Sequence, residues 1–340
     1  MDNKVLIEAK SLRKYFKIPG KGFLHAVDDL SFSVEEGQTL GLVGESGCGK
    51  STVGNVVMRL IPSSGGELLY RGKNVFTAGK EESLELRKHM QIIFQDPYSS
   101  LNPRKTIGKI LSEAYEIHRI GTHEEITTKV HDLCDLVQIP KNLLQHYPHE
   151  LDGGMRQVVG IARALSLDSD FIVCDEPVSS LDVSVQARII NLLMDVQKEK
   201  NISYLFISHD LSVVRHISNR VAVMYLGRIV EIADVDRIFR NTLHPYSIAL
   251  LSAVPKVNVE TRPSRIILTG DVPSPINPKP GCRFAARCWM AQPECFENEP
   301  VLTEVEAGHC VACHYATKSQ EIAKQIVATQ QRGGDEQCRI

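Results

Sequence analysis

One stretch of the chain carries the residue types needed to hold a polyphosphate. GESGCGKST fits the pattern G-x-x-x-x-G-K-[ST], follows the apolar run TLGLV and precedes the helical pattern VGNVVMRLI. Glycines let backbone N–H groups turn toward phosphate, a lysine supplies positive charge for the outer phosphates, and a hydroxyl can join the shell of Mg²⁺. The N-terminus of the following helix adds partial positive charge. We therefore expect a polyphosphate site at Gly44, Glu45, Ser46, Gly47, Cys48, Gly49, Lys50, Ser51 and Thr52.

Two adjacent carboxylates follow a second apolar run. FIVCDEP places Asp175 and Glu176 at the end of a predicted buried strand. Asp175 is suited to hold Mg²⁺ through its shell and Glu176 to orient or deprotonate a water, as nucleotide hydrolysis requires. A carboxylate pair after a strand can also cap the next helix. The phosphate loop upstream favours the catalytic interpretation.

The order of the motifs is more specific than any one of them. After the phosphate loop come Gln95 in IIFQDP, the stretch LDGGMRQ, the carboxylate pair, Asp182 in SSLD and His209 in ISHD. Over residues 4–240 this order resembles the ATP-binding subunits of ABC transporters. The resemblance implies the P-loop NTPase fold of an ABC ATPase and an activity that uses ATP and Mg²⁺.

The same resemblance implies roles for individual side chains. Phe16 would stack on adenine, with Tyr15 as a nearby substitute, and Asp182 would help to join two nucleotide sites across a dimer. Gln95 would sense Mg²⁺ and the attacking water, and His209 would contact the γ-phosphate. The expected catalytic residues are Glu176, His209 and Gln95, and the expected Mg²⁺ ligands are Ser51, Gln95 and Asp175. The alternatives are a core aromatic for Phe16, a solvated loop residue for Gln95 and a helix cap for His209.

The stretch LDGGM departs from the family's pattern at an important position. The matching residues are normally L-S-G-G-Q, whose serine and following helix contact the γ-phosphate held by the opposite subunit. Here Asp152 replaces the serine, before Gly153 and Gly154. Aspartate caps a helix as well as serine does, but its charge would repel the phosphate. We expect Asp152 to impair the partner's ATP site, unless the carboxylate points away or is protonated.

Three further stretches narrow the resemblance: FQDPYSSLNPRKTIG, HPYSIALLSAVP and GCRFAARC. They look like segments of the oligopeptide/dipeptide/nickel importer subgroup. Membership would imply a second ATPase subunit, which we expect to be a different chain, two membrane permeases and an external solute-binding protein. The chain would then lie at the cytoplasmic face of the cell membrane. Peptides are the expected cargo, and nickel chelates are the alternative cargo. The alternative function is a mainly regulatory nucleotide-binding subunit, in which Asp152 makes the signature stretch degenerate.

Five cysteines crowd into one segment near the C-terminus. Of these, only Cys310 and Cys313 have the short spacing usual in zinc sites. The resembling subgroup carries a [4Fe–4S] cluster, whose ligands map to Cys282, Cys288, Cys295 and Cys313. Soft thiolates suit iron–sulfur centres. Free buried thiols and zinc are the alternatives, and Cys310 could replace Cys313.

These residues need a scaffold that brings distant motifs together. Up to about residue 240, short runs rich in Val, Ile and Leu alternate with amphipathic stretches, which is typical of an α/β fold with a largely buried sheet. Helical patterns without a clear strand predict a helical insertion at about 97–168, and RVAVMYLGRIVEIA predicts a hairpin around Gly227. Beyond Pro255, Pro, Gly and Cys prevail and predict a second small unit. The expected divisions are an ATP-binding domain at 1–255, a Cys-rich region at 256–318 and a tail at 319–340.

The composition argues against several other classes of protein. The formal net charge is −2, so the chain lacks the basic field that nucleic-acid binding needs, and we expect no nucleic-acid partner. ABC proteins that act on nucleic acid or ribosomes usually carry two ATPase cassettes or a long coiled-coil insertion, and neither is visible here. Stretches of about 18 consecutive apolar residues are also missing, which predicts a protein at most peripheral to a membrane.

Overall fold

The chain folds around two sheets, and a computed structural model describes residues 4–254, 266–323 and 325. One sheet has the strand order β11-β12-β10-β9-β3-β8-β7-β6, and the other has the order β2-β1-β4-β5. The strands are β1 (Val5–Ile18), β2 (Gly22–Glu35), β3 (Thr39–Val43), β4 (Gly65–Tyr70), β5 (Lys73–Asn74), β6 (Met90–Ile93), β7 (Phe171–Asp175), β8 (Ser203–Ser208), β9 (Arg220–Tyr225), β10 (Arg228–Asp234), β11 (Thr303–Glu306) and β12 (His309–Val311). The helices are α1 (Lys50–Val57), α2 (Lys80–His89), α3 (Pro97–Ser100), α4 (Ile107–Ile117), α5 (His123–Val137), α6 (Gly153–Leu165), α7 (Val183–Lys200), α8 (Leu211–Ile217), α9 (Val235–Arg240), α10 (Pro245–Ser252) and α11 (Pro293–Glu297).

The larger sheet is parallel at its centre and buried on both faces. Strands β9, β3, β8, β7 and β6 pair in parallel, and β3 and β7 are buried at every residue. Strands covered on both sides read as continuous apolar runs, which explains TLGLV and FIVCD. Helices α7 and α8 pack on one face, and α1 with the four-stranded sheet covers the other. The carboxyl ends of β3, β7 and β8 therefore lie at one edge of the sheet, where the chemistry-bearing motifs begin.

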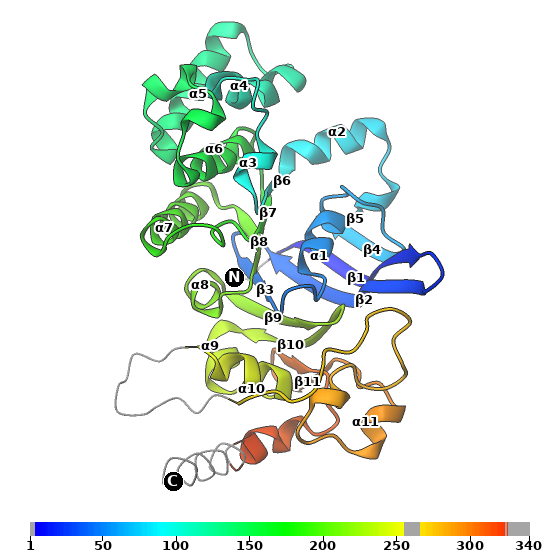
Figure 1. The fold of residues 1–340 in the computed structure, drawn as a ribbon. Helices are drawn as coiled ribbons and strands as arrows, with labels where there is room; N and C mark the ends of the chain where they lie inside the picture. Colours follow the sequence, from blue (N-terminus) through cyan, green and yellow to red (C-terminus); the bar gives the residue numbers. More distant parts are fainter. Residues whose placement is uncertain (1–3, 255–265, 324, 326–340) are drawn as a thin grey trace, which may run out of the picture.

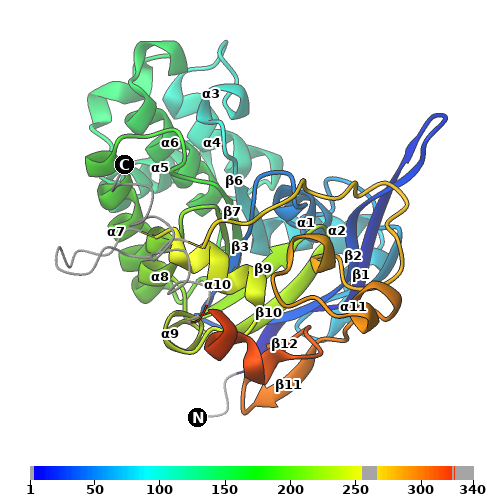
Figure 2. The same ribbon diagram turned by 60° about the horizontal axis from the view of Figure 1, so that its bottom comes forward.

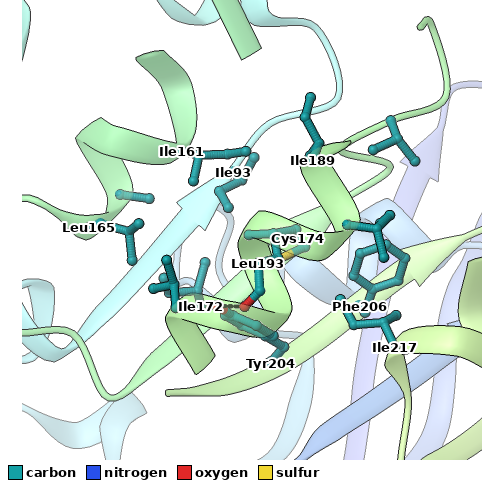
Figure 3. Packing of buried hydrophobic residues seen from close by; sticks show 14 of the residues in the cluster. Ile93, Ile161, Leu165, Ile172, Cys174, Ile189, Leu193, Tyr204, Phe206 and Ile217 are labelled. Atoms are coloured by element: carbon teal, nitrogen blue, oxygen red, sulfur yellow. Dashed lines mark hydrogen bonds between the residues drawn. The ribbon is translucent and has the colours of Figure 1, made fainter. Parts of the chain in front are cut away.

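A close-packed core fixes the strands that carry the site (Figure 3). Ile172 and Cys174 of β7 and Phe206 of β8 are fully buried with Leu193 of α7. The Tyr204 hydroxyl donates a hydrogen bond of 3.0 Å to the Leu193 carbonyl oxygen, so this buried polar group is satisfied. Such packing leaves the strand ends little freedom to shift.

The expected helical insertion is present. Helices α3, α4, α5 and α6 lie between β6 and β7 and contact one another, and they form the upper part of the molecule in Figure 1. Helix α5 begins with a capping box in which Thr122 and Glu125 each bond to the other's backbone N–H. In the described part of this insertion no strand occurs. It forms a helical lobe attached at the edge strand β6 and the buried strand β7.

The C-terminal residues return to the main sheet. Strands β9 and β10 form the hairpin expected around Gly227, β12 pairs with β10, and β11 pairs with β12. Figure 2 shows residues 266–302, the described part of the chain just before β11, in front of part of β9, β10 and the β1–β2 sheet. Since these residues extend the same sheet, a separate second unit is not confirmed. Most of the expected tail at 319–340 lies outside the described residues, as does Pro255.

The longest helix of the described ranges is α7, with 18 residues. None of the helices in these ranges combines the length and the apolar character required to span a membrane.

Candidate functional site

The phosphate loop connects the end of β3 to the start of α1. Gly49, the residue before α1, has φ +109°, a conformation that L side chains rarely adopt. A Cβ atom at this position would lie 2.0 Å from the backbone oxygen of Ala26. Only glycine therefore fits, and the backbone can turn tightly enough to aim its N–H groups into the loop.

Lys50 is held inside this loop. Its side chain is buried, and Nζ donates to the carbonyl oxygens of Gly44 at 2.8 Å and Glu45 at 3.1 Å. An ammonium group has three donors, so it can exchange such bonds for phosphate oxygens without moving far. The loop thus presents one positive charge at the N-terminus of α1.

Ser51 and Asp175 meet although they lie far apart in the sequence. The Ser51 hydroxyl donates to Asp175 Oδ1 at 2.8 Å. Burial raises the pKa of Asp175, and the nearby Glu176 carboxylate adds to the rise, whereas the Ser51 hydrogen bond lowers it. A buried carboxylate beside a hydroxyl and a phosphate loop is a site where a divalent cation would favour the ionised form.

Three polar side chains converge next to this pair. The carboxylate of Glu176 accepts a hydrogen bond from Gln95 Nε2 at 3.1 Å and lies 3.2 Å from His209 Nδ1. Glu176 has φ +45°, which is unusual for a residue with a side chain, and its N–H donates to the Ile207 carbonyl oxygen at 3.0 Å. Sheet pairing therefore holds a strained backbone that turns this carboxylate toward the loop.

A cavity of about 520 Å³ joins the loop to these side chains. Gln95, Glu176 and His209 line it together with Phe16, a residue that is 36% exposed. Tyr15 is engaged elsewhere, because its hydroxyl bonds to Asp28 and its ring stacks on His25. Of the expected site residues, this cavity's walls hold Phe16, Ser46, Gly47, Cys48, Gly49, Lys50, Ser51, Thr52, Gln95, Glu176 and His209.

Sequence reasoning missed one wall of this cavity. Pro275 lines it, and the Pro275 carbonyl oxygen accepts from the His25 N–H at 3.0 Å. Ile276 forms a bridge with Leu24, so the C-terminal chain lies against the start of β2. Pro275 belongs to a proline-rich stretch without a motif, and no sequence signal could have placed it here.

The signature stretch lies away from the cavity of its own chain. Asp152, Gly153, Gly154 and Asp182 are absent from the cavity's walls. Asp152 is exposed and caps α6, with Oδ1 accepting from the Met155 N–H at 2.7 Å. Asp182 is also exposed and precedes α7. Within one chain these four residues have no part in the cavity.

Four cysteines surround a second, smaller cavity. Cys282, Cys288, Cys295 and Cys313 all line it, whereas Cys310 lies on β12 against the other core. Burial raises the pKa of Cys288 to about 12 and that of Cys313 to about 11. Among the described residues no group of three or more His, Cys, Asp or Glu side chains could hold a single metal ion. The spacing left Cys310 and Cys313 as alternatives, and the fold brings only Cys313 to the other three.

Two protein families match parts of the chain. The ABC transporter family matches residues 27–179, and the C-terminal region of oligopeptide/dipeptide transporters matches residues 230–295. The first match contains the phosphate loop, Gln95 and the carboxylate pair. The second contains three of the four cysteines of the smaller cavity.

Similar proteins align over nearly the whole chain. The oligopeptide transport ATP-binding protein AppF of Bacillus subtilis is 46% identical over 322 residues, which are 92% of this chain and 98% of AppF. The dipeptide transport ATP-binding protein DppF of Haemophilus influenzae is 47% identical over 319 residues, with coverage of 92% and 98%. Among solved structures, the dimeric ATP-binding cassette MJ0796 bound to ADP and Pi matches with a TM-score of 0.62 at 24% identity, covering 68% of this chain and 99% of that one.

Proposed function

Since this chain belongs to the oligopeptide/dipeptide transport ATP-binding proteins of the ABC transporter family, we propose that it hydrolyses ATP to drive uptake of peptides through membrane permeases. The family is one of ATPases that use ATP and Mg²⁺. The observation that carries the proposal is the meeting of Lys50, Ser51 and Gln95–Glu176–His209 at one cavity, with Asp175 hydrogen-bonded to Ser51. Relatives named for oligopeptides and dipeptides favour peptide cargo over nickel chelates.

Each side chain has a defined task in hydrolysis. Lys50 exchanges the carbonyl oxygens of Gly44 and Glu45 for outer phosphate oxygens. Ser51, Gln95 and Asp175 would hold Mg²⁺, and the raised pKa of buried Asp175 fits a site completed by a cation. The bound Mg²⁺ would neutralise part of the negative charge on the phosphates.

Glu176 is the group that prepares the water. Its carboxylate is held between Gln95 and His209, so it can accept a water proton while Gln95 orients the water. His209 then donates toward the γ-phosphate. Phe16 at the mouth of the cavity offers its ring to adenine.

A second ATPase subunit completes each site. Asp152, Gly153, Gly154 and Asp182 stand outside their own cavity and are exposed or lie at helix starts, which supports a position facing the partner's nucleotide. Because Asp152 brings a negative charge there, we propose that the partner is a different chain with an intact signature. The site on this chain would then turn over normally, while the site on the partner would be slow.

A groove of about 510 Å³ is our proposed contact with the permeases. It lies between the end of α1, α2, β6 and α4, and its rim exposes Leu60, Leu84 and Ile117. An apolar permease segment would bury these side chains and place the chain at the cytoplasmic face of the membrane. Strand β6 leads directly to Gln95, so movement at the groove would reach the nucleotide. An external solute-binding protein would deliver the peptide to the permeases.

We also propose that Cys282, Cys288, Cys295 and Cys313 hold a [4Fe–4S] cluster. Their shared cavity and soft donors support this, because thiolates are the usual ligands of iron–sulfur clusters. The raised pKa values of Cys288 and Cys313 indicate neutral thiols unless a positive metal centre offsets their burial. Iron and acid-labile sulfide should be lost from a Cys288→Ser variant purified anaerobically and retained in Cys310→Ser, its matched control. Retention in both variants would contradict the ligand assignment.

The function is tested in proteoliposomes that contain this chain, its partner ATPase and the permeases. Peptide uptake should require ATP, and Glu176→Gln should slow hydrolysis by this chain's site about 10²- to 10⁴-fold while leaving ATP binding intact. Glu67→Gln, an exposed change on β4, is the matched control and should have no effect. Uptake that continues without ATP, or full turnover in Glu176→Gln, would disprove the proposal.

A further inference from the structure

The phosphate loop is held from outside by a residue of the cysteine segment. Arg287 lies between Cys282 and Cys288, and its Nη1 is 2.9 Å from Oε2 of Glu45, the second residue of the loop. Its Nη2 donates to Oε1 of the same carboxylate at 3.3 Å. The Arg287 side chain is only 10% exposed and that of Glu45 33%. A shielded, two-pronged pair of this kind is more strongly bound than an ordinary surface ion pair.

A second contact holds the backbone of the same loop residue. The Glu45 N–H donates to the hydroxyl oxygen of Tyr246 at 2.8 Å. Tyr246 is fully buried in α10 and packs against Tyr225 and Phe284, with ring centroids 4.7 and 5.5 Å away. Two groups from the C-terminal third of the chain thus fix both the main chain and the side chain of Glu45.

Glu45 also connects these groups to the phosphate-binding lysine. Its carbonyl oxygen accepts from Lys50 Nζ at 3.1 Å, so a shift of Glu45 would displace a bond that orients Lys50. Its carboxylate would add negative charge beside a polyphosphate if it were unpaired. Arg287 supplies the opposite charge and therefore removes this repulsion.

We infer that Arg287 and Tyr246 are positioning residues for the phosphate loop, and that they make nucleotide affinity depend on the docked cysteine segment. The inference rests on the proposed function only in that the loop binds ATP. Arg283 docks the same segment differently, because it bonds to Asp28 and to the Leu226 carbonyl oxygen rather than to the loop. The segment therefore has one anchor on the sheet and another on the loop.

The test is ATP binding by the full-length chain, measured by isothermal titration calorimetry with Mg–ATP. Arg287→Met keeps the length of the side chain but leaves Glu45 unpaired, and it should raise the Kd by about five- to tenfold. Tyr246→Phe should raise the Kd by about two- to fivefold, since only one hydrogen bond is lost. Addition of Glu45→Gln to Arg287→Met should recover at least half of the loss on a logarithmic scale, because both charges are then absent.

Matched variants separate positioning from general stability and from the proposed function. Arg71→Met removes another arginine that pairs with two carboxylates, far from the loop, and should bind ATP as the parent does. Arg287→Lys keeps the charge and should bind ATP within about twofold of the parent. In hydrolysis assays Arg287→Met should raise KM and leave kcat nearly unchanged.

An unchanged Kd in Arg287→Met would overturn the inference, as would equal losses in Arg71→Met or failure of Glu45→Gln to restore binding. A parent chain that does not bind Mg–ATP, with Lys50→Ala no different from it, would instead refute the proposed function.

Discussion

Replacement of Asp152 by serine should speed hydrolysis in the assembled transporter. In the structure the Asp152 carboxylate uses one oxygen, Oδ1, to cap α6 through the Met155 N–H, and the side chain is exposed. Serine offers the same cap, so the free energy of unfolding should change by less than about 0.5 kcal/mol. The effect of the substitution on hydrolysis is therefore expected to come from the lost charge.

The magnitude follows from the position proposed for this residue. Two unit charges about 4 Å apart at an effective dielectric near 20 repel by roughly 4 kcal/mol. Mg²⁺, the partner's loop lysine and solvent would screen about half of this repulsion. The remaining ~2 kcal/mol corresponds to a roughly thirtyfold weaker closure around ATP. Relief of this repulsion should raise turnover severalfold or more, up to the point at which another step limits the rate.

The assay is ATP hydrolysis by the complete transporter, purified anaerobically with its own partner subunits. Asp152→Ser and Asp152→Asn both remove the charge and keep a helix cap, so both should raise the rate. Asp182→Asn removes a charge at the neighbouring helix start and serves as a comparison. Parent-like rates in both Asp152 variants would refute the reasoning and make the carboxylate a helix cap only.

Two further outcomes follow from buried groups. Glu231 is fully buried and accepts hydrogen bonds from the Leu243 N–H at 2.7 Å and the His244 N–H at 3.1 Å, and it pairs with His309 at 2.8 Å. Glu231→Gln should therefore lower the free energy of unfolding, measured in urea, by about 3 kcal/mol. A loss under about 1 kcal/mol would contradict this prediction. Without bound metal, the thiols of Cys288 and Cys313 ionise near pH 8.5 when unfolded but only near pH 12 and 11 when folded. Their neutral forms thus stabilise the fold below about pH 8.5, and the free energy of unfolding should fall as the pH rises toward 11–12. Replacement of both cysteines by alanine should make this decline less steep, and a pH dependence identical to that of the parent would exclude the two thiols as contributors.

Much of the site could be predicted because its motifs follow buried strands. Ser51 and Asp175 belong to motifs that end at the same edge of a parallel sheet, so their contact follows from topology once β3 and β7 are recognised. The fold was predictable for the same reason, since continuous apolar runs mark the central strands and helical patterns mark the insertion.

The remaining contacts depend on how the chain returns after α10. Pro275 and Arg287 reach the loop region because β12 pairs with β10 and draws the preceding segment across the cavity's edge. Tyr246 reaches the same loop from α10 itself. No local periodicity encodes such a path. The cysteine spacing likewise left Cys310 and Cys313 equivalent as ligands. Strand β12 ends between them, so Cys310 packs against the core and Cys313, beyond the strand, lines the cysteine cavity.

The late pairing of β12 with β10 also sets an order of events on the ribosome. Glu231 of β10 and His309 of β12 are 78 residues apart, so at 5–20 residues per second the free edge of β10 waits about 4–16 s for its partner strand. An unpaired strand edge is a template for association with other chains. Translation that stops before His309 should therefore release a chain whose main sheet is open at β10 and prone to aggregate, although every nucleotide-binding motif has already been made.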